Sequence, residues 1–217
     1  MPRRILLIAV VLLWSAARSR AADSKVVVEL FTSQGCSSCP PADALLSELA
    51  RDPHIIPLAF HVDYWDHLGW RDPFSSHQWS ERQVAYVRAM NLDSAYTPQA
   101  IVNGERQMVG SDRRALTDAI ARASRERRDA SVTLDNGVAR GSAPRALDLF
   151  AVVVKSGATT AVKSGENSGR TLRNDAVVRE LKRIARVNGT FSNAVGPANV
   201  VFLQDPTTLR IYAAATR

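Results

Sequence analysis

The chain has 217 residues, of which 46% are hydrophobic and 23% are charged, and it contains 10 prolines, 11 glycines and only 2 cysteines. This composition excludes a disordered, a collagen-like and a disulfide-scaffolded chain, and it predicts a globular protein of one large or two small domains. The formal net charge of +7 suggests nucleic-acid binding at first sight. How that charge is interpreted depends on where the basic residues lie.

The N-terminus has the three parts of a secretory signal peptide over residues 1–21. Arg3 and Arg4 precede a short apolar run, and a small-x-small cleavage site ends at Ala21. The run is too short for a bilayer core, which needs about 20 residues; an uncleaved anchor and a buried helix are the alternatives. Cleavage removes four arginines and lowers the net charge to about +3. We therefore expect a periplasmic or secreted protein that binds no nucleic acid and has no stable membrane insertion after cleavage.

Cys36 and Cys39 are the only cysteines, and they lie three positions apart. The β-branched run 25–31 predicts a strand, residues 32–35 a turn, and the leucine spacing within 40–50 a helix. The CxxC motif is therefore expected at the N-terminus of a helix. In an oxidising compartment the two cysteines can pair with each other.

The position of the motif gives the two sulfurs different expected roles. The free amides at a helix N-terminus stabilise a thiolate, so Cys36, expected on the exposed outer side, would be the attacking sulfur. Cys39 would then resolve the mixed disulfide. A structural disulfide is one alternative, although closing so short a loop stabilises a protein by only about 2 kcal/mol. Metal ligation is the other.

Alternating strands and helices continue through the first half of the chain. Asn103-Gly104 is a strong hairpin signal between two of these strands. The predicted order over residues 22–129 is β-α-β-α-β-β-α, an α/β fold. After the CxxC helix, the expected elements are a strand within 54–64, a helix within 75–91, strands within 96–105 and 106–110, and a helix after Asp112.

A CxxC motif between a strand and a helix, followed about sixty residues later by Thr97-Pro98, resembles the thioredoxin fold. The stretches 27–43, 60–65, 96–99 and 165–172 resemble more closely a family of secreted bacterial thioredoxin-like proteins of unassigned function. The likeness covers nearly the whole mature chain.

The resemblance assigns roles to three further residues. It implies that Pro98 follows a cis peptide bond and lies against the cysteines, and that Thr97 offers backbone hydrogen bonds to a substrate segment. It also implies that Glu29 is a buried acid beneath the cysteine pair that assists proton transfer. From the sequence alone, Glu29 is equally well interpreted as an exposed strand-edge residue.

Residues 61–74 hold the densest group of aromatic and titratable side chains. They follow the second strand, and loops at the carboxyl ends of parallel strands meet at one edge of a sheet, so this loop is expected near Cys36. Trp65 is predicted to bind substrate; its alternative role is to fill the core. His61, together with Asp63, His67 and His77, raises the possibility of a copper or zinc site with the cysteine pair. No metal ligand is assigned, however, and no cofactor is expected.

After about residue 129 the pattern changes to strands. Residues 130–134, 146–155, 199–204 and 209–214 all read as strands, whereas the apolar spacing of 175–187 also fits a helix. We expect residues 130–217 to form a smaller, β-rich, sandwich-like domain without cysteine or histidine. This domain would either dock or present a substrate, or give plain structural support.

The sequence thus predicts an exported thiol-disulfide oxidoreductase that acts through Cys36 and Cys39. Its expected partners are the thiols and disulfides of other exported proteins and a redox partner. There are two alternative functions. One is a copper-binding accessory protein that uses the cysteine pair and His61, and the other is a non-catalytic binding module.

Overall fold

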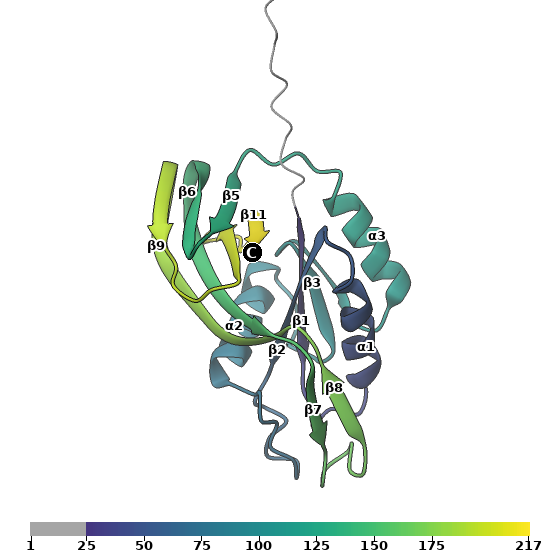
Figure 1. Ribbon diagram of the computed structural model, residues 1–217. Helices are drawn as coiled ribbons and strands as arrows, with labels where there is room; N and C mark the ends of the chain where they lie inside the picture. The colour runs from purple at the N-terminus through teal and green to yellow at the C-terminus, as the bar shows by residue number, and fades with distance from the viewer. Residues whose placement is uncertain (1–24) are drawn as a thin grey trace, which may run out of the picture.

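The computed structural model describes residues 25–217, so the predicted signal peptide lies outside the described residues. The described part is a mixed α/β fold built on one large sheet (Figure 1). Its first half runs β1 (Val26–Thr32), α1 (Pro40–Leu49), β2 (Ile55–His61), α2 (His77–Ala89), β3 (Gln99–Val102), β4 (Arg106–Val109) and α3 (Arg113–Ala123). The predicted β-α-β-α-β-β-α order is therefore confirmed.

The second half consists of strands only. They are β5 (Ser131–Asp135), β6 (Val138–Lys155), β7 (Ala158–Ala161), β8 (Thr171–Asn174), β9 (Val177–Ala194), β10 (Val200–Gln204) and β11 (Ile211–Thr216). The order in the large sheet is β11-β10-β6-β9-β2-β1-β3-β4, with β5 paired to β6, while β7 and β8 form a separate hairpin.

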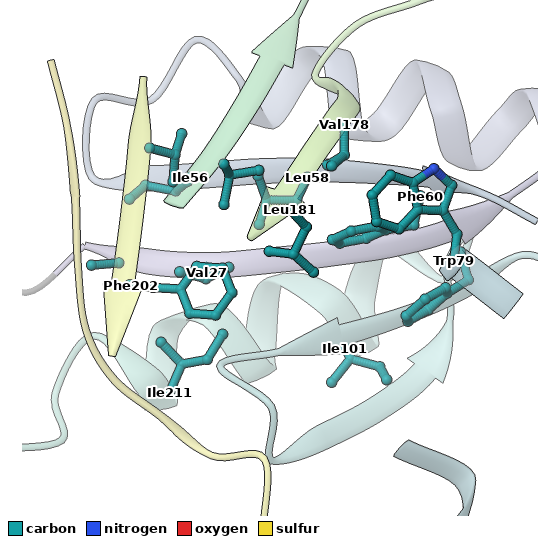
Figure 2. Close-up of a cluster of buried hydrophobic side chains, with 14 of the residues drawn as sticks. Val27, Ile56, Leu58, Phe60, Trp79, Ile101, Val178, Leu181, Phe202 and Ile211 are labelled. Carbon is teal, nitrogen blue, oxygen red and sulfur yellow. The ribbon is translucent and has the colours of Figure 1, made fainter. Parts of the chain in front are cut away.

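The two halves of the chain contribute strands to one sheet. β9 pairs in parallel with β2 at Val177 and Ala59, so the C-terminal strands extend the N-terminal sheet. The C-terminal strands also pack against one another. β5 contacts β11, and these strands enclose a hydrophobic core of their own. A second core combines side chains of both halves, including Val27 of β1 and Phe202 of β10 (Figure 2).

The segment 175–187, whose spacing also fits a helix, lies in strand β9. β9 pairs with β6 over almost its full length, and the register shifts at three places. Such bulges break the alternation of a strand, which explains why the apolar positions of this segment mimic a helical spacing.

The helices lie on both faces of the sheet, and the alternation of β1 decides which side chains meet which helix. Val28 and Leu30 face α1 and α3, whereas Val27 and Phe31 face α2. At the tight turn between β3 and β4, Asn103 and Gly104 both have positive φ angles, of 48° and 69°, as the predicted hairpin turn requires.

Candidate functional site

The CxxC motif connects β1 to α1, with Cys39 at the N-cap of the helix. Pro40 and Pro41 occupy the first turn, where the missing amide hydrogens cost no intrahelical bond. Both cysteines are free thiols. Both are also fully buried, with 0% of each residue exposed, so the expectation that Cys36 lies on the exposed outer side is wrong.

Two segments from elsewhere in the chain cover the motif, which explains the burial of Cys36. The indole of Trp65, in the loop after β2, donates a hydrogen bond to the Thr97 hydroxyl at 2.8 Å, and its Cβ lies against Gly35. From the loop between β7 and β8, the Asn167 amide donates to the carbonyl oxygens of Gln34 and Cys36, each at 2.9 Å.

The neighbouring residue Glu166 adds a further contact between this loop and the motif. Its carboxylate accepts a hydrogen bond from the Ser37 amide at 2.9 Å. The sequence marked residues 165–172 as a stretch that resembles the family, but nothing local connects them with a motif about 130 positions earlier.

The surroundings of the Cys36 thiol favour its ionised form. Its pKa is lowered from 9.0 to about 6, chiefly because Cys39 donates a hydrogen bond to its sulfur, with burial opposing and Ser38 and Thr97 contributing further hydrogen bonds. The Ser38 hydroxyl lies 3.2 Å from the sulfur, and the Thr97 carbonyl oxygen 3.9 Å. Because the thiolate is the reactive form of cysteine, a pKa of about 6 leaves Cys36 largely reactive at neutral pH.

The pKa of Cys39 moves in the opposite direction. Burial raises it far above the ordinary value, and the hydrogen bond to Cys36 and the negative charges of Cys36 and Asp43 raise it further. Hydrogen bonding by the Thr32 side chain lowers the pKa of Cys39, but it offsets only part of this rise. The motif therefore holds one thiol that ionises readily and one that keeps its proton.

Asp43, one turn after Cys39, is buried beside this pair and was not predicted as a site residue. Its amide donates to the Cys39 carbonyl at 3.1 Å, and its carboxylate accepts a hydrogen bond from the Thr32 hydroxyl at 2.8 Å. Burial raises the pKa of Asp43 from 3.8 to about 6, against the lowering effects of His61 and Thr32. The i, i+4 spacing from Cys39 within a helix was the sequence signal for this contact.

His61 pairs with Thr32 in the parallel register of β1 and β2, so it lies on the same face of the sheet. Its Nδ1 lies 2.7 Å from the Asp72 carboxylate, which also accepts the Gln34 amide. Burial disfavours the charged imidazole, but the charge and hydrogen bond of Asp72 outweigh it and raise the His61 pKa. Within residues 25–217, the buried Nε2 of His61 has no hydrogen-bond partner. We call Thr32, Asp43, His61 and Asp72 the thiol-side cluster.

Glu29 is buried, as the resemblance implied, but it lies away from the cysteines. It lies two positions from both Val27 and Phe31, so it points with them to the α2 face of the sheet, whereas α1 and the thiols lie on the other face. There it forms a 2.7 Å ion pair with Arg82 and accepts a short hydrogen bond from Tyr86. Gln204 of β10 completes this group, and we call these four residues the salt-bridge cluster.

The structure brings Thr97, Pro98 and Trp65 to the cysteine motif. The Thr97-Pro98 peptide bond is cis, and the Thr97 carbonyl accepts from Cys36. Trp65 is half-buried and bonded to the Thr97 hydroxyl, so its ring lies beside the motif and remains in part accessible.

Of the three histidines that suggested a metal site, His61 alone belongs to the thiol-side cluster. His77 is exposed beside Asp63 at 3.2 Å, and His67 is exposed in the loop after β2. Among the residues that the structure describes, no three His, Cys, Asp or Glu side chains are grouped so that they could hold a metal ion.

Comparison with known proteins gives the chain a family. Residues 27–207 match the model of DUF1223, described as a protein family of unknown function. The chain belongs to the DUF1223 family. A search of curated proteins found no match.

Two solved structures resemble this DUF1223 chain. An X-ray structure of a protein from Agrobacterium tumefaciens, a structural-genomics target, is 28% identical, with a TM-score of 0.74 over 88% of this chain and 92% of that one. HBP35 of Porphyromonas gingivalis is 13% identical, with a TM-score of 0.59 over 90% of this chain and 75% of that one. The second likeness is one of fold alone.

Proposed function

We propose that this DUF1223 protein is a thiol-disulfide oxidoreductase with a thioredoxin-like fold that exchanges disulfides with other proteins. The observation that carries the proposal is the pair of reduced thiols at the N-terminus of α1 with opposite pKa shifts. Cys36 ionises near pH 6, while the buried Cys39 keeps its proton. A structural disulfide needs no such difference, whereas sequential attack by two thiols does.

The exchange proceeds in two steps. The Cys36 thiolate attacks one sulfur of a substrate disulfide, so that a bond between Cys36 and the substrate forms, the substrate S–S bond breaks and one substrate thiolate leaves. Cys39 then loses its proton and attacks Cys36, which forms the Cys36–Cys39 disulfide and releases the second substrate thiolate. The substrate gains two electrons and the cysteine pair loses two. A redox partner restores the dithiol by the same exchange in reverse.

The surroundings of Cys36 support a peptide as the substrate. The Thr97 carbonyl next to the sulfur is a backbone acceptor for an extended segment, and Trp65 offers an aromatic surface beside it. Because Cys36 is covered, the substrate must displace Trp65 or the loop that carries Asn167 before the sulfurs meet.

Export from the cytoplasm is part of the proposal. The support is the sequence of residues 1–21, with its basic start, apolar run and small-x-small site. Over residues 25–217, no helix is long and apolar enough to cross a membrane. The protein partners would then be other exported proteins that carry thiols or disulfides.

A turnover assay tests this function. The protein is added to insulin with dithiothreitol as electron donor, and the reduction of the insulin disulfides is followed by turbidity. We expect the wild type to accelerate reduction, Cys36→Ser to give no acceleration, and Cys39→Ser to accumulate a mixed disulfide through Cys36. Equal rates for the wild type and both variants would contradict an oxidoreductase and favour a binding module.

A further inference from the structure

An open cavity of about 650 Å³ lies between α1 and β8, which contact each other (Figure 1). We call it the α1–β8 cavity. Asp43, Ser47 and Arg51 line it from the helix side, and Ser156 and Leu172 line it from the opposite side. Its volume falls within the range of small-molecule sites, about 300–1,000 Å³. The proposed sulfur exchange makes no use of it.

Two charged groups of the α1–β8 cavity, Asp43 and Arg51, form no ion pair with any other residue of the described range 25–217. The other charged residues that line it are paired, Arg173 with Asp175 at 3.1 Å and Glu48 with Arg113 of α3 at 2.8 Å. Asp43 is only 7% exposed, and within residues 25–217 its carboxylate accepts one hydrogen bond, from Thr32. An ionised carboxylate accepts about four, so this buried group has unused capacity toward the cavity.

The two unpaired charges lie in one row along the helix. Asp43, Ser47 and Arg51 are spaced four residues apart, and residues at this spacing share a helix face. The helix ends at Leu49, but the C-cap Ala50 keeps helical φ and ψ angles of −61° and −13°, so Arg51 continues the row. At 1.5 Å per residue, the eight positions from Asp43 to Arg51 place the two charges about 12 Å apart.

A ligand that carries both charges at its ends suits this arrangement. An ammonium group would lie at Asp43 and a carboxylate at Arg51. A single amino acid is too short to reach both, whereas three residues of extended peptide span about 10–11 Å.

Two hydroxyls of the cavity are available to the peptide groups of such a ligand. The Ser156 hydroxyl accepts the Ala176 amide at 2.9 Å, so its own proton is free for a peptide carbonyl. The Ser47 hydroxyl donates to the Asp43 carbonyl at 3.0 Å, so its lone pairs are free for a peptide amide. The cavity therefore offers a donor and an acceptor between its two charges.

We propose that the α1–β8 cavity binds a short free peptide of about three residues, with its terminal ammonium at Asp43 and its terminal carboxylate at Arg51. An internal segment of a protein does not fit, because it carries neither terminal charge. Asp43 is buried and Arg51 is exposed, so the ammonium end contributes more to affinity than the screened carboxylate end. This binding goes beyond the proposed function and does not require sulfur exchange.

Binding should depend on pH, because the ammonium group needs an ionised carboxylate. Burial raises the pKa of Asp43 from 3.8 to about 6, so Asp43 is ionised at pH 7 and protonated at pH 5. Cys36 also ionises near pH 6, and an Asp43→Asn variant separates the two effects. The titratable and charged groups that face Asp43 are Cys36 and Cys39 before α1, His61 of β2, Asp72 of the following loop, and Arg173 and Asp175 across the cavity.

Titration of the isotope-labelled, reduced protein with tri-alanine tests the site, with amide chemical shifts followed by NMR. We expect saturable shifts in the amides of α1 and β8 at pH 7, and an affinity about tenfold lower at pH 5. Free alanine, and tri-alanine with an acetylated N-terminus and an amidated C-terminus, should each bind at least about tenfold more weakly. Each lacks a charge-assisted hydrogen bond that tri-alanine makes.

Variants at the two ends should weaken binding unequally. Asp43→Asn should lower the affinity for tri-alanine about tenfold at pH 7 and remove most of its pH dependence. Arg51→Gln should lower it only about threefold, because the pair that it breaks is exposed. Asp118→Asn and Arg122→Gln are the matched controls, since both residues are exposed on α3, and they should bind like the wild type.

Three results would overturn the site. They are the absence of saturable shifts in α1 and β8 at millimolar tri-alanine, equal affinity for the blocked peptide or for alanine, and wild-type affinity in Asp43→Asn. Near-UV circular dichroism shows whether Asp43→Asn is folded; if it is not, the blocked peptide and Arg51→Gln decide. The insulin assay is independent of this titration, so failure of the peptide site leaves the oxidoreductase standing, and the converse also holds.

Discussion

Two buried polar clusters lie on opposite faces of the same sheet, and they differ in how completely their groups are paired. In the salt-bridge cluster, Glu29 is held by Arg82 and Tyr86, and the Arg82 guanidinium also lies over the rings of Phe60, Tyr86, Phe150 and Phe202. In the thiol-side cluster, Asp43 keeps a raised pKa and His61 Nε2 is without a partner among residues 25–217.

The difference separates a structural role from a chemical one. The salt-bridge cluster joins β1 and α2 to β10 of the C-terminal half, and its charges are satisfied within it. The thiol-side cluster lies beside the two sulfurs, and burial raises the pKa of its carboxyl group Asp43 to about 6. Perturbed and incompletely paired groups of that kind are typical of functional sites.

The largest effect on stability is expected from Arg82→Met. This change leaves the Glu29 carboxylate buried without its cation, which costs about 3–5 kcal/mol of unfolding free energy. Urea unfolding measures it. The double variant Glu29→Met with Arg82→Met should recover most of the loss, because no buried charge remains. A loss below about 1 kcal/mol for Arg82→Met would show that this cluster is not the structural one.

Asp43→Asn should gain stability relative to the wild type as the pH rises, whereas Arg82→Met loses it. The folded-state pKa of Asp43 is raised from 3.8 to about 6, so the folded protein holds this proton more tightly than the unfolded chain. Its contribution to stability is fully present below about pH 4 and is lost as the pH rises through about 6. The unfolding free energy of Asp43→Asn relative to the wild type should therefore increase by about 2–3 kcal/mol from pH 4 to pH 7. A difference that does not change with pH would contradict the raised pKa.

Asn167→Ala tests whether the covering loop limits access to the thiol-side cluster. It removes two hydrogen bonds to the motif, each worth about 1 kcal/mol, and should raise the open population roughly 30-fold. The rate of Cys36 alkylation at pH 8 should rise accordingly. Ser168→Ala, in the same loop but without a bond to the motif, is the control. An unchanged rate in Asn167→Ala would show that Cys36 is reached by another route.

The smallest effect is expected from Arg113→Ala. Arg113 and Glu48 form an ion pair at 2.8 Å, nearly the distance of the buried pair, but their side chains are 60% and 50% exposed. Solvent screens such a pair, so the change should cost less than about 1 kcal/mol in urea unfolding. A loss as large as that of Arg82→Met would mean that burial does not explain the difference between the two pairs.

Local patterns in the sequence predicted much of the fold. The element order of the first half, the Asn103-Gly104 turn and the position of the CxxC motif all follow from signals within a few residues. The pairing of β9 with β2 does not, because it depends on bulges and on contacts far apart in the chain.

The candidate site was predictable in part. Cys36, Cys39, Thr97 and Pro98 are marked by their residue types and spacing. The face on which Glu29 lies could also have been predicted. Residues two positions apart in a strand share a face, so Glu29 lies with Phe31 on the α2 side, away from the cysteines. The burial of Cys36 was not, because the covering residue Asn167 comes from a hairpin about 130 positions later.

The pH dependence of Cys36 alkylation by iodoacetamide shows whether this motif holds a thiol with a lowered pKa. The reduced protein is reacted over pH 4–10, and modification at Cys36 is followed by mass spectrometry of the intact chain and its peptides. We expect the rate to rise through about pH 6, while Cys39 stays unmodified. A rate that rises only near pH 9, as for an ordinary thiol, would contradict a redox centre at this motif.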